Sequence, residues 1–316
     1  MLRRIGPLSA AVVVLLAAFQ ITADVPEGFL SRDNVIDLCE QISVNAILAF
    51  GMTLVILIRG IDLSVGRVVA LVGTVTAFVL SQREGQVQSL AWVALAMACG
   101  LSVAGAVGAF NGVCAARTRM PPFIITLATM WVAKGAALRL NSEPIPIPAR
   151  EEAFLWIGTG RLLGAVPVPI VIMLVVFAAC TVLLHQTRFG QHLYAMGGNR
   201  EAARFTGIPL ASREVAVYVI CSLLAGVAGM IHAAQLYSAE PGSGEGFELD
   251  AIAAAVVGGT SLAGGSGTMY GTLIGAVIIG ILDKGLNQTG VHYSLKYIVK
   301  GLVVLAAVYV DVRRRK

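Results

Sequence analysis

Long apolar runs without charge dominate this sequence and indicate its fold class. Residues 43–58, 68–82 and 86–116 contain no Asp, Glu, Lys or Arg. Buried strands of soluble α/β domains give apolar runs of only about 4–8 residues, whereas a helix needs roughly 20 to cross a bilayer. No alternation of apolar and polar residues recurs, as it would in a membrane β-barrel. The pattern therefore predicts an all-α, polytopic helical membrane protein.

The same pattern predicts about ten transmembrane helices, since each span needs roughly 20 mostly apolar residues. We expect them near residues 5–22, 42–58, 66–81, 89–115, 123–140, 165–184, 214–236, 250–263, 269–285 and 295–311. The eighth is short enough to be re-entrant or broken. Spans two to five and seven to ten enter from opposite sides and share glycine-rich spacing, which suggests an inverted repeat. We expect one transmembrane domain over residues 1–316, with a polar loop at about 188–214.

The distribution of charged residues predicts how the chain is oriented in the membrane. Only 13% of residues are charged, against roughly 25% in soluble domains. If the chain starts in the cytoplasm, most of its 23 Lys and Arg residues fall in cytoplasmic segments, as the positive-inside rule requires. We therefore expect both termini to be cytoplasmic. We attribute the net charge of +5 to the basic cytoplasmic segments of a membrane protein, since the sequence shows no basic patch that would bind nucleic acid. The first apolar stretch also resembles a secretory signal, although we favour an uncleaved helix.

The polar loop at 188–214 contains the strongest local signal. Asn199 is a good helix N-cap, because its side-chain oxygen accepts from free N–H groups of the first turn. Gly207 suits the left-handed conformation that ends a helix, and Pro209 prevents continuation. The loop thus predicts a short helix at 199–205, which is stable only when it docks against something. A capped surface helix without special role is the alternative.

Glu201-Ala202-Ala203 followed by Gly207 resembles the start of the EAA-x3-G signature of bacterial ABC importer permeases. The downstream part of that signature is not clearly present. In that superfamily the element is a coupling helix that sits in a groove of the ATPase subunit. The resemblance thus implies ATPase coupling through this segment, with the residues Asn199, Glu201, Ala202, Ala203 and Gly207.

Other segments resemble the ribose-type sugar permeases of the branched-amino-acid/ribose permease superfamily, in family order from about residue 35 to 310. They are 51–56 (GMTLVI), 60–66 (GIDLSVG), 110–112 (FNG), 122–127 (PFIITL), 248–254 (ELDAIAA) and 258–265 (GGTSLAGG). Arg59 departs from the family, in which a small residue commonly precedes Gly60.

The resemblance implies a permease of the bacterial inner membrane that pairs with a second copy or a paralogue. A cytoplasmic ATPase would drive it, and a periplasmic binding protein would deliver a simple sugar. The sequence agrees, because no lysine stands in the G-x4-G-K-[S/T] frame of a phosphate-binding loop. We expect a transport subunit that is not itself an enzyme and needs no cofactor. The four histidines show no metal-ligand spacing.

Polar residues in or near the spans are the candidates for a translocation pathway. Asp62 and Ser64 lie among glycines at the start of a span, where irregular backbone is tolerated only inside protein or beside water. They serve equally well as caps of the third helix. Asn111 and Thr126 are either pathway residues or partners in interhelical hydrogen bonds.

Four carboxylates precede the eighth span, in a segment expected on the outer side. As a solvated charge run they need no role, but they are also candidates for docking the binding protein, since complementary charge steers encounter. They are Glu240, Glu245, Glu248 and Asp250.

Two other functions stay open from sequence alone. An ion-coupled secondary carrier for a small polar solute would place ionisable groups at mid-membrane, and Lys134 and Lys300 are the main candidates. A membrane enzyme acting on lipid-linked sugar would need paired carboxylates or a metal cluster at one interface, and none is evident. A need for ATP in uptake separates the importer from the carrier.

Overall fold

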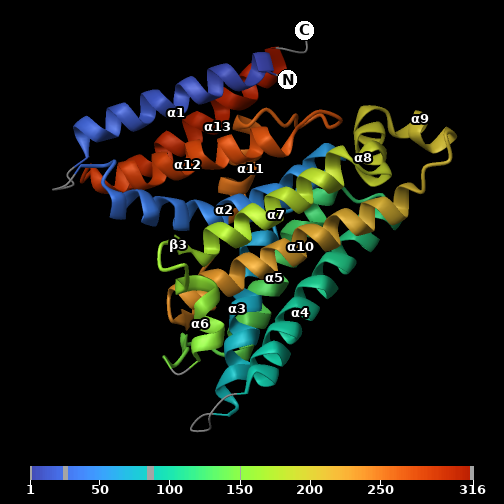
Figure 1. Cartoon of the computed structure of the whole chain (residues 1–316). Helices are drawn as coiled ribbons and strands as arrows, with labels where there is room; N and C mark the ends of the chain where they lie inside the picture. Colours follow the sequence, from blue (N-terminus) through green and yellow to red (C-terminus); the bar gives the residue numbers. More distant parts are fainter. Residues whose placement is uncertain (1, 24–27, 84–88, 150, 314–316) are drawn as a thin grey trace.

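The computed structural model describes residues 2–23, 28–83, 89–149 and 151–313 (Figure 1). Its helices are α1 Leu2–Thr22, α2 Arg32–Leu57, α3 Val65–Ser81, α4 Leu90–Arg117, α5 Pro122–Leu140, α6 Glu152–Thr159, α7 Val168–His185, α8 Arg188–Gly198, α9 Arg200–Phe205, α10 Leu210–Gln235, α11 Phe247–Val257, α12 Met269–Gln288 and α13 Tyr293–Arg313. The short strands β1 Ile145–Pro146 and β4 Ser238–Ala239 pair antiparallel, as do β2 Arg161–Leu162 and β3 Val166–Pro167.

The predicted all-α membrane architecture is confirmed. A helix lies at each of the expected span positions, and within the described ranges six of them, α2, α4, α5, α7, α10 and α12, are long and apolar enough to cross a bilayer. Two further helices, α6 and α8, were not expected. The short helix predicted at 199–205 is α9, and α8 and α9 together lie in the polar loop that follows α7.

Two predicted boundaries are wrong, for different reasons. The second helix begins at Arg32 and not near residue 42, because Asn34 in its first turn accepts hydrogen bonds from Lys284 and Gln288 near the end of α12. The eighth helix ends at Val257 and not at 263, because the chain turns through Gly259, Gly264 and Gly265, all with φ between 69° and 91°.

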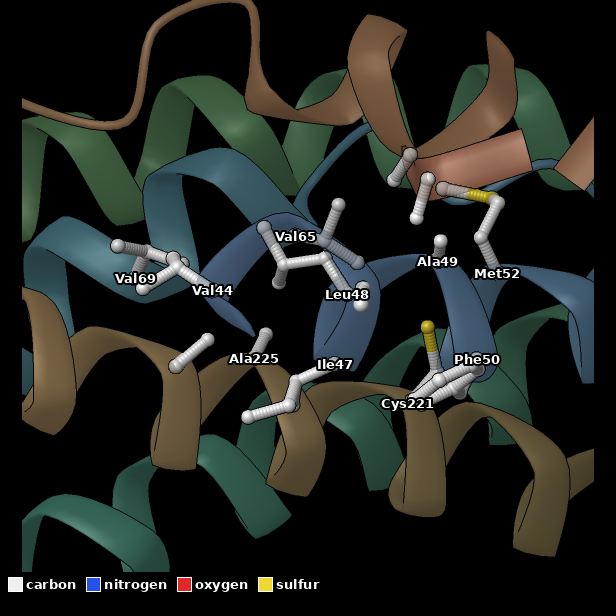
Figure 2. Packing of buried hydrophobic residues seen from close by; sticks show 14 of the residues in the cluster. Val44, Ile47, Leu48, Ala49, Phe50, Met52, Val65, Val69, Cys221 and Ala225 are labelled. Atoms are coloured by element: carbon white, nitrogen blue, oxygen red, sulfur yellow. The ribbon is translucent and has the colours of Figure 1, made fainter. Parts of the chain in front are cut away.

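The centre of the bundle is the pair of 26-residue helices α2 and α10. Ile47 and Phe50 of α2 lie against Cys221 and Ala225 of α10 (Figure 2). The backbones approach so closely that a Cβ on Gly51 would lie 3.1 Å from Cα of Cys221. Small residues allow such contact in lipid, where dispersion between close-packed backbones replaces the missing hydrophobic drive. The α2–α10 pair sets the positions of the two segments that follow these helices in the chain.

Both central helices are followed by a non-glycine residue with positive φ. Two residues after α2, Arg59 has φ 67°, and two residues after α10, Tyr237 has φ 52°. Each chain then turns back toward the interior before the next helix begins. The helix after the second break, α11, has 11 residues and spans about 16 Å, too short for a hydrocarbon core of roughly 30 Å.

The two breaks occur at opposite ends of the bundle, and their chains meet inside it. A Cβ on Gly66, at the start of α3, would lie 2.3 Å from the carbonyl oxygen of Gly244, just before α11. An inverted repeat, which the glycine spacing suggests, would place the two breaks at opposite ends in this way, and it stays a prediction. Below, the end of the bundle that holds α8 and α9 is called the α9 end, and the opposite end is called the α6 end (Figure 1).

Candidate functional site

The short helix expected in the polar loop is α9, and its ends are as predicted. Oδ1 of Asn199 accepts a hydrogen bond from the N–H of Ala202 at 3.0 Å. Gly207 has φ 80°, and the N–H of Ile208 donates to the carbonyl of Ala203 at 3.3 Å, which closes the helix end. A six-residue helix is marginal alone, so its stability depends on docking.

One ion pair and one buried methyl group dock α9 to the bundle. Ala203 is buried, and Arg200 pairs with Glu214 of α10 at 2.5 Å. Beside α9, Nε of Arg213 on α10 donates to His192 of α8 at 3.2 Å and joins α8 to α10. The opposite face is free: Glu201 and Ala202 are exposed, and Phe205 is 86% exposed. A large apolar side chain held out on a fixed helix is typical of a protein contact surface.

Arg59 joins this segment to the central helix α2. Its Nε donates to the carbonyl of Gly197 and its guanidinium to the carbonyl of Gly198, both at 2.8 Å. These carbonyls end α8, where unpaired acceptors and the helix dipole favour a cation. The chain between α11 and α12 closes the junction, since the N–H of Gly265 donates to the carbonyl of Leu57 at 2.9 Å. The end of α2, the end of α8 and the chain between α11 and α12 thus meet beside α9.

The four pathway candidates from the sequence lie together beside the break after α2. Oδ1 of Asp62 accepts from the N–H and the hydroxyl of Ser64, at 2.9 and 2.6 Å. Asn111 of α4 donates to the Ser64 hydroxyl at 3.0 Å and accepts from Thr129 of α5 at 2.7 Å. Thr126 of α5 donates to the carbonyl of Ile61 and accepts from the N–H of Leu63, both at 3.1 Å.

This buried network ties the broken segment to α4 and α5. Asp62, Ser64, Asn111 and Thr126 all have zero exposed area. Interhelical hydrogen bonding therefore accounts for their contacts in this conformation, and the Ser64 side chain makes no N-cap hydrogen bond to α3. Contact with a permeating solute requires the network to open, so that role stays a prediction.

The acidic segment after α10 does not form a single charged surface. Glu240 and Glu245 are exposed, and Glu245 pairs with Arg67 of α3 at 2.6 Å. The hydrogen bond from Arg67 lowers the pKa of Glu245. Glu248 is half-buried and accepts from the N–H of Gly246 at 3.3 Å, while Asp250 is buried in the bundle. Glu240 and Glu245 alone of these four are thus available to a partner.

Asp250 belongs to an ion cluster at the α6 end that sequence reasoning missed. Nζ of Lys300 on α13 lies 2.8 and 2.9 Å from the two oxygens of Asp250 on α11. It also lies 2.8 Å from Oδ1 of Asp283 on α12, and Lys296 lies 3.4 Å from the same oxygen. The signal was in the sequence, because Lys296 and Lys300 are four residues apart and therefore share a helix face.

The cluster borders a cavity of about 880 Å³, lined by α2, α6, β2, α10, α11, α12 and α13. Acidic and amide side chains of α2 face it, as do Arg161 of β2 and Tyr297 of α13. Ionisable groups within transmembrane bundles usually face such interiors. No cluster of three or more His, Cys, Asp or Glu side chains suited to a metal ion occurs among the described residues.

Residues 34–308 match the family model described as the permease component of a branched-chain amino acid transport system. The chain belongs to this permease family. The permease component of such a transport system is its membrane subunit and not its ATPase.

Relatives of this permease have sugar transport in their names. The ribose import permease protein of Escherichia coli strain K12 is 46% identical over 308 residues, which cover 96% of this chain and 94% of the relative. The ribose import permease protein of Bacillus subtilis is 40% identical over 311 residues, covering 98% and 93%. The L-arabinose ABC transporter permease protein of Azospirillum brasilense is 34% identical over 307 residues, covering 97% and 88%.

Proposed function

We propose that this chain is the membrane-spanning permease of an ABC importer for a simple sugar. A separate cytoplasmic subunit hydrolyses ATP, and a periplasmic binding protein delivers the sugar. The observation that carries the proposal is α9: a docked, capped helix at one end of the bundle that presents an exposed Phe205. The names of the relatives support a sugar as the substrate, with ribose the first to test.

The proposed orientation places the α9 end in the cytoplasm, together with both termini. The positive-inside distribution of Lys and Arg supports it. The α6 end then faces the periplasm, where the exposed Glu240 and Glu245 are available to basic residues of the binding protein. The whole chain forms one transmembrane domain that pairs with a second copy or a paralogue around a central path.

Coupling runs through the junction at Arg59. An ATPase that grips α9 through Phe205, Glu201 and Ala202 moves α8 with it, because α8 and α9 adjoin at Asn199. Arg59 binds the last carbonyls of α8, so the movement reaches α2 and the buried network around Asp62. That network closes the path at the α9 end in the present conformation.

The ion cluster is the feature that would favour an ion-coupled carrier. Its two lysines are matched by two carboxylates, Asp250 and Asp283, so it holds no unbalanced charge for a coupling cation to replace. Lys134, the other candidate, lies over the ring of Trp131 at 5.3 Å. The importer therefore accounts better for the geometry.

The test is affinity purification of the chain from its native membrane, with mass spectrometry of co-purifying proteins. We expect a phosphate-loop ATPase with the wild type. Gly207→Val should reduce its recovery about tenfold, because a β-branched residue at φ 80° is strained and the end of α9 shifts. Phe205→Ala should reduce it by a similar factor.

Gly290→Val is the matched control, since Gly290 also has positive φ and open space but lies at the α6 end. It should leave ATPase recovery unchanged. Equal loss in both glycine variants, or normal recovery with Gly207→Val and Phe205→Ala, would count against coupling through α9.

A further inference from the structure

The cavity at the α6 end extends deep into the bundle. On α2 its lining runs from Asp37 to Asn45, and on α13 from Lys296 to Val304. Each of these two helix segments covers eight residue steps, which is a rise of about 12 Å. The cavity therefore extends about 12 Å along both helices. Asn45, 7% exposed, lies at the inner part beside Ala253 of α11. The cavity is thus open on one side and reaches buried residues of α2 and α11 on the other.

Buried, paired charges line this pocket. Asp250 and Asp283 are 9% and 3% exposed, and Lys300 bridges them. Charged side chains at such depth face a bundle interior or a water-filled space and not lipid. The residual exposure of the three groups is toward the pocket, since all three line it.

The charge of the lining selects against anions. Five carboxylates, Asp37, Glu40, Glu245, Asp250 and Asp283, face three basic side chains, Arg161, Lys296 and Lys300. Arg67 and Lys284, which lie just outside the lining, pair with Glu245 and Asp37, so the charges around the pocket balance. A phosphorylated solute would bring an uncompensated charge into the pocket, because Lys296 and Lys300 are already paired with carboxylates, whereas a neutral solute would not.

The remaining chemistry fits a polyhydroxylated ring. Carboxylates accept hydrogen bonds from hydroxyl groups, lysines donate to them, and the amides of Gln41 and Asn45 do both. Tyr297 and Phe247 supply aromatic faces for the C–H side of a sugar. Ligand pockets commonly have about 300–1,000 Å³, so a monosaccharide would share this one with water and leave easily.

We propose that this pocket, between α2, α11 and α13, is the site where the permease first holds the neutral sugar released by the binding protein. The identity of the ligand rests on the proposed function. The site differs from the buried network around Asp62, which sequence reasoning singled out.

The first test uses proteoliposomes with the chain, its ATPase and its binding protein. Gln41→Leu and Asn45→Leu keep side-chain size but remove a donor and an acceptor. ATP-driven ribose uptake should fall about tenfold, the equivalent of one hydrogen bond, while ATPase activity stimulated by the loaded binding protein stays within about twofold. Gln82→Leu, on an exposed glutamine outside the pocket, should change neither rate. Unchanged uptake in both pocket variants would overturn the site.

The second test needs no ATPase and therefore separates this proposal from the proposed function. In a variant whose five cysteines are replaced, Tyr297→Cys is labelled from the α6 side with a trimethylammonium thiol reagent. Ribose at millimolar concentration should slow labelling at least threefold, and ribose 5-phosphate should not. Absence of protection by ribose, or equal protection by both, would overturn the site. Protection without ATP-driven uptake would retain the site and reject the importer.

Discussion

The helix breaks after α2 and α10 share a residue with positive φ but differ in the polar and charged groups around them. After α2 and after α10, one residue with positive φ turns the chain back into the bundle. At the α9 end the returning segment is held by hydrogen bonds around Asp62, which has zero exposure and no ion-pair partner among the described residues. At the α6 end it carries carboxylates, and lysines of α13 hold them beside an open cavity.

The difference shows how one repeated backbone motif gives two chemically unlike ends of the bundle. A closed end and an end with an open cavity are what the proposed alternating-access permease needs in a conformation open to one side. The segments after the two breaks are in contact at Gly66 and Gly244, so a displacement of one segment also displaces the other. Four substitutions test this comparison.

Lys300→Met should have the largest effect. It leaves Asp250 and Asp283 buried without their shared cation, which costs about 3–5 kcal/mol. Thermal unfolding in detergent measures this loss. Lys296→Met is the matched control and should cost clearly less, since Asp283 keeps Lys300. Equal melting temperatures for the two variants would show that Lys300 does not hold the cluster.

Gly66→Ala should cost about 3 kcal/mol, because the new methyl group would lie 2.3 Å from the Gly244 carbonyl and from a Glu248 oxygen. We expect a melting temperature about 10 °C lower. Gly135→Ala in α5 has open space and should be neutral or slightly stabilising. A harmless Gly66→Ala would mean that the breaks do not touch.

Asp62→Asn should cost less than about 1 kcal/mol, because an amide oxygen still accepts both hydrogen bonds from Ser64. Among the described residues no ion pair to Asp62 is found. Asp283→Asn should be worse, because it leaves Lys296 and Lys300 with less compensation. If Asp62→Asn is the more harmful of the two, hydrogen bonding alone does not account for the network around Asp62.

Glu245→Gln should have the smallest effect, since Glu245 is exposed. The hydrogen bond from Arg67 lowers its pKa below the usual 4.5. A lowered carboxyl pKa stabilises the fold above about pH 4.5, and this contribution is lost as the pH falls through the folded-state value. The melting temperatures of wild type and variant should therefore differ slightly at pH 7 and converge in acid. A constant difference would exclude the pair as its cause.

Sequence patterns predicted the helices well because apolar length is a local property. They predicted α9 for the same reason, since Asn199 and Gly207 act within the helix they bound. The start of α2 was wrong because its polar turns are compensated by α12, far along the chain. The cavity was missed because Asp250, Asp283 and Lys300 come from three helices that only the fold brings together.

ATP-driven sugar uptake by the purified components is the most direct test of the account. Proteoliposomes with this chain, its ATPase and its binding protein are loaded with ATP on the α9 side, and labelled ribose is added on the α6 side. We predict accumulation that requires ATP hydrolysis and persists when ionophores collapse every ion gradient. Uptake by the chain alone, driven by a proton or sodium gradient and indifferent to ATP, would contradict the account.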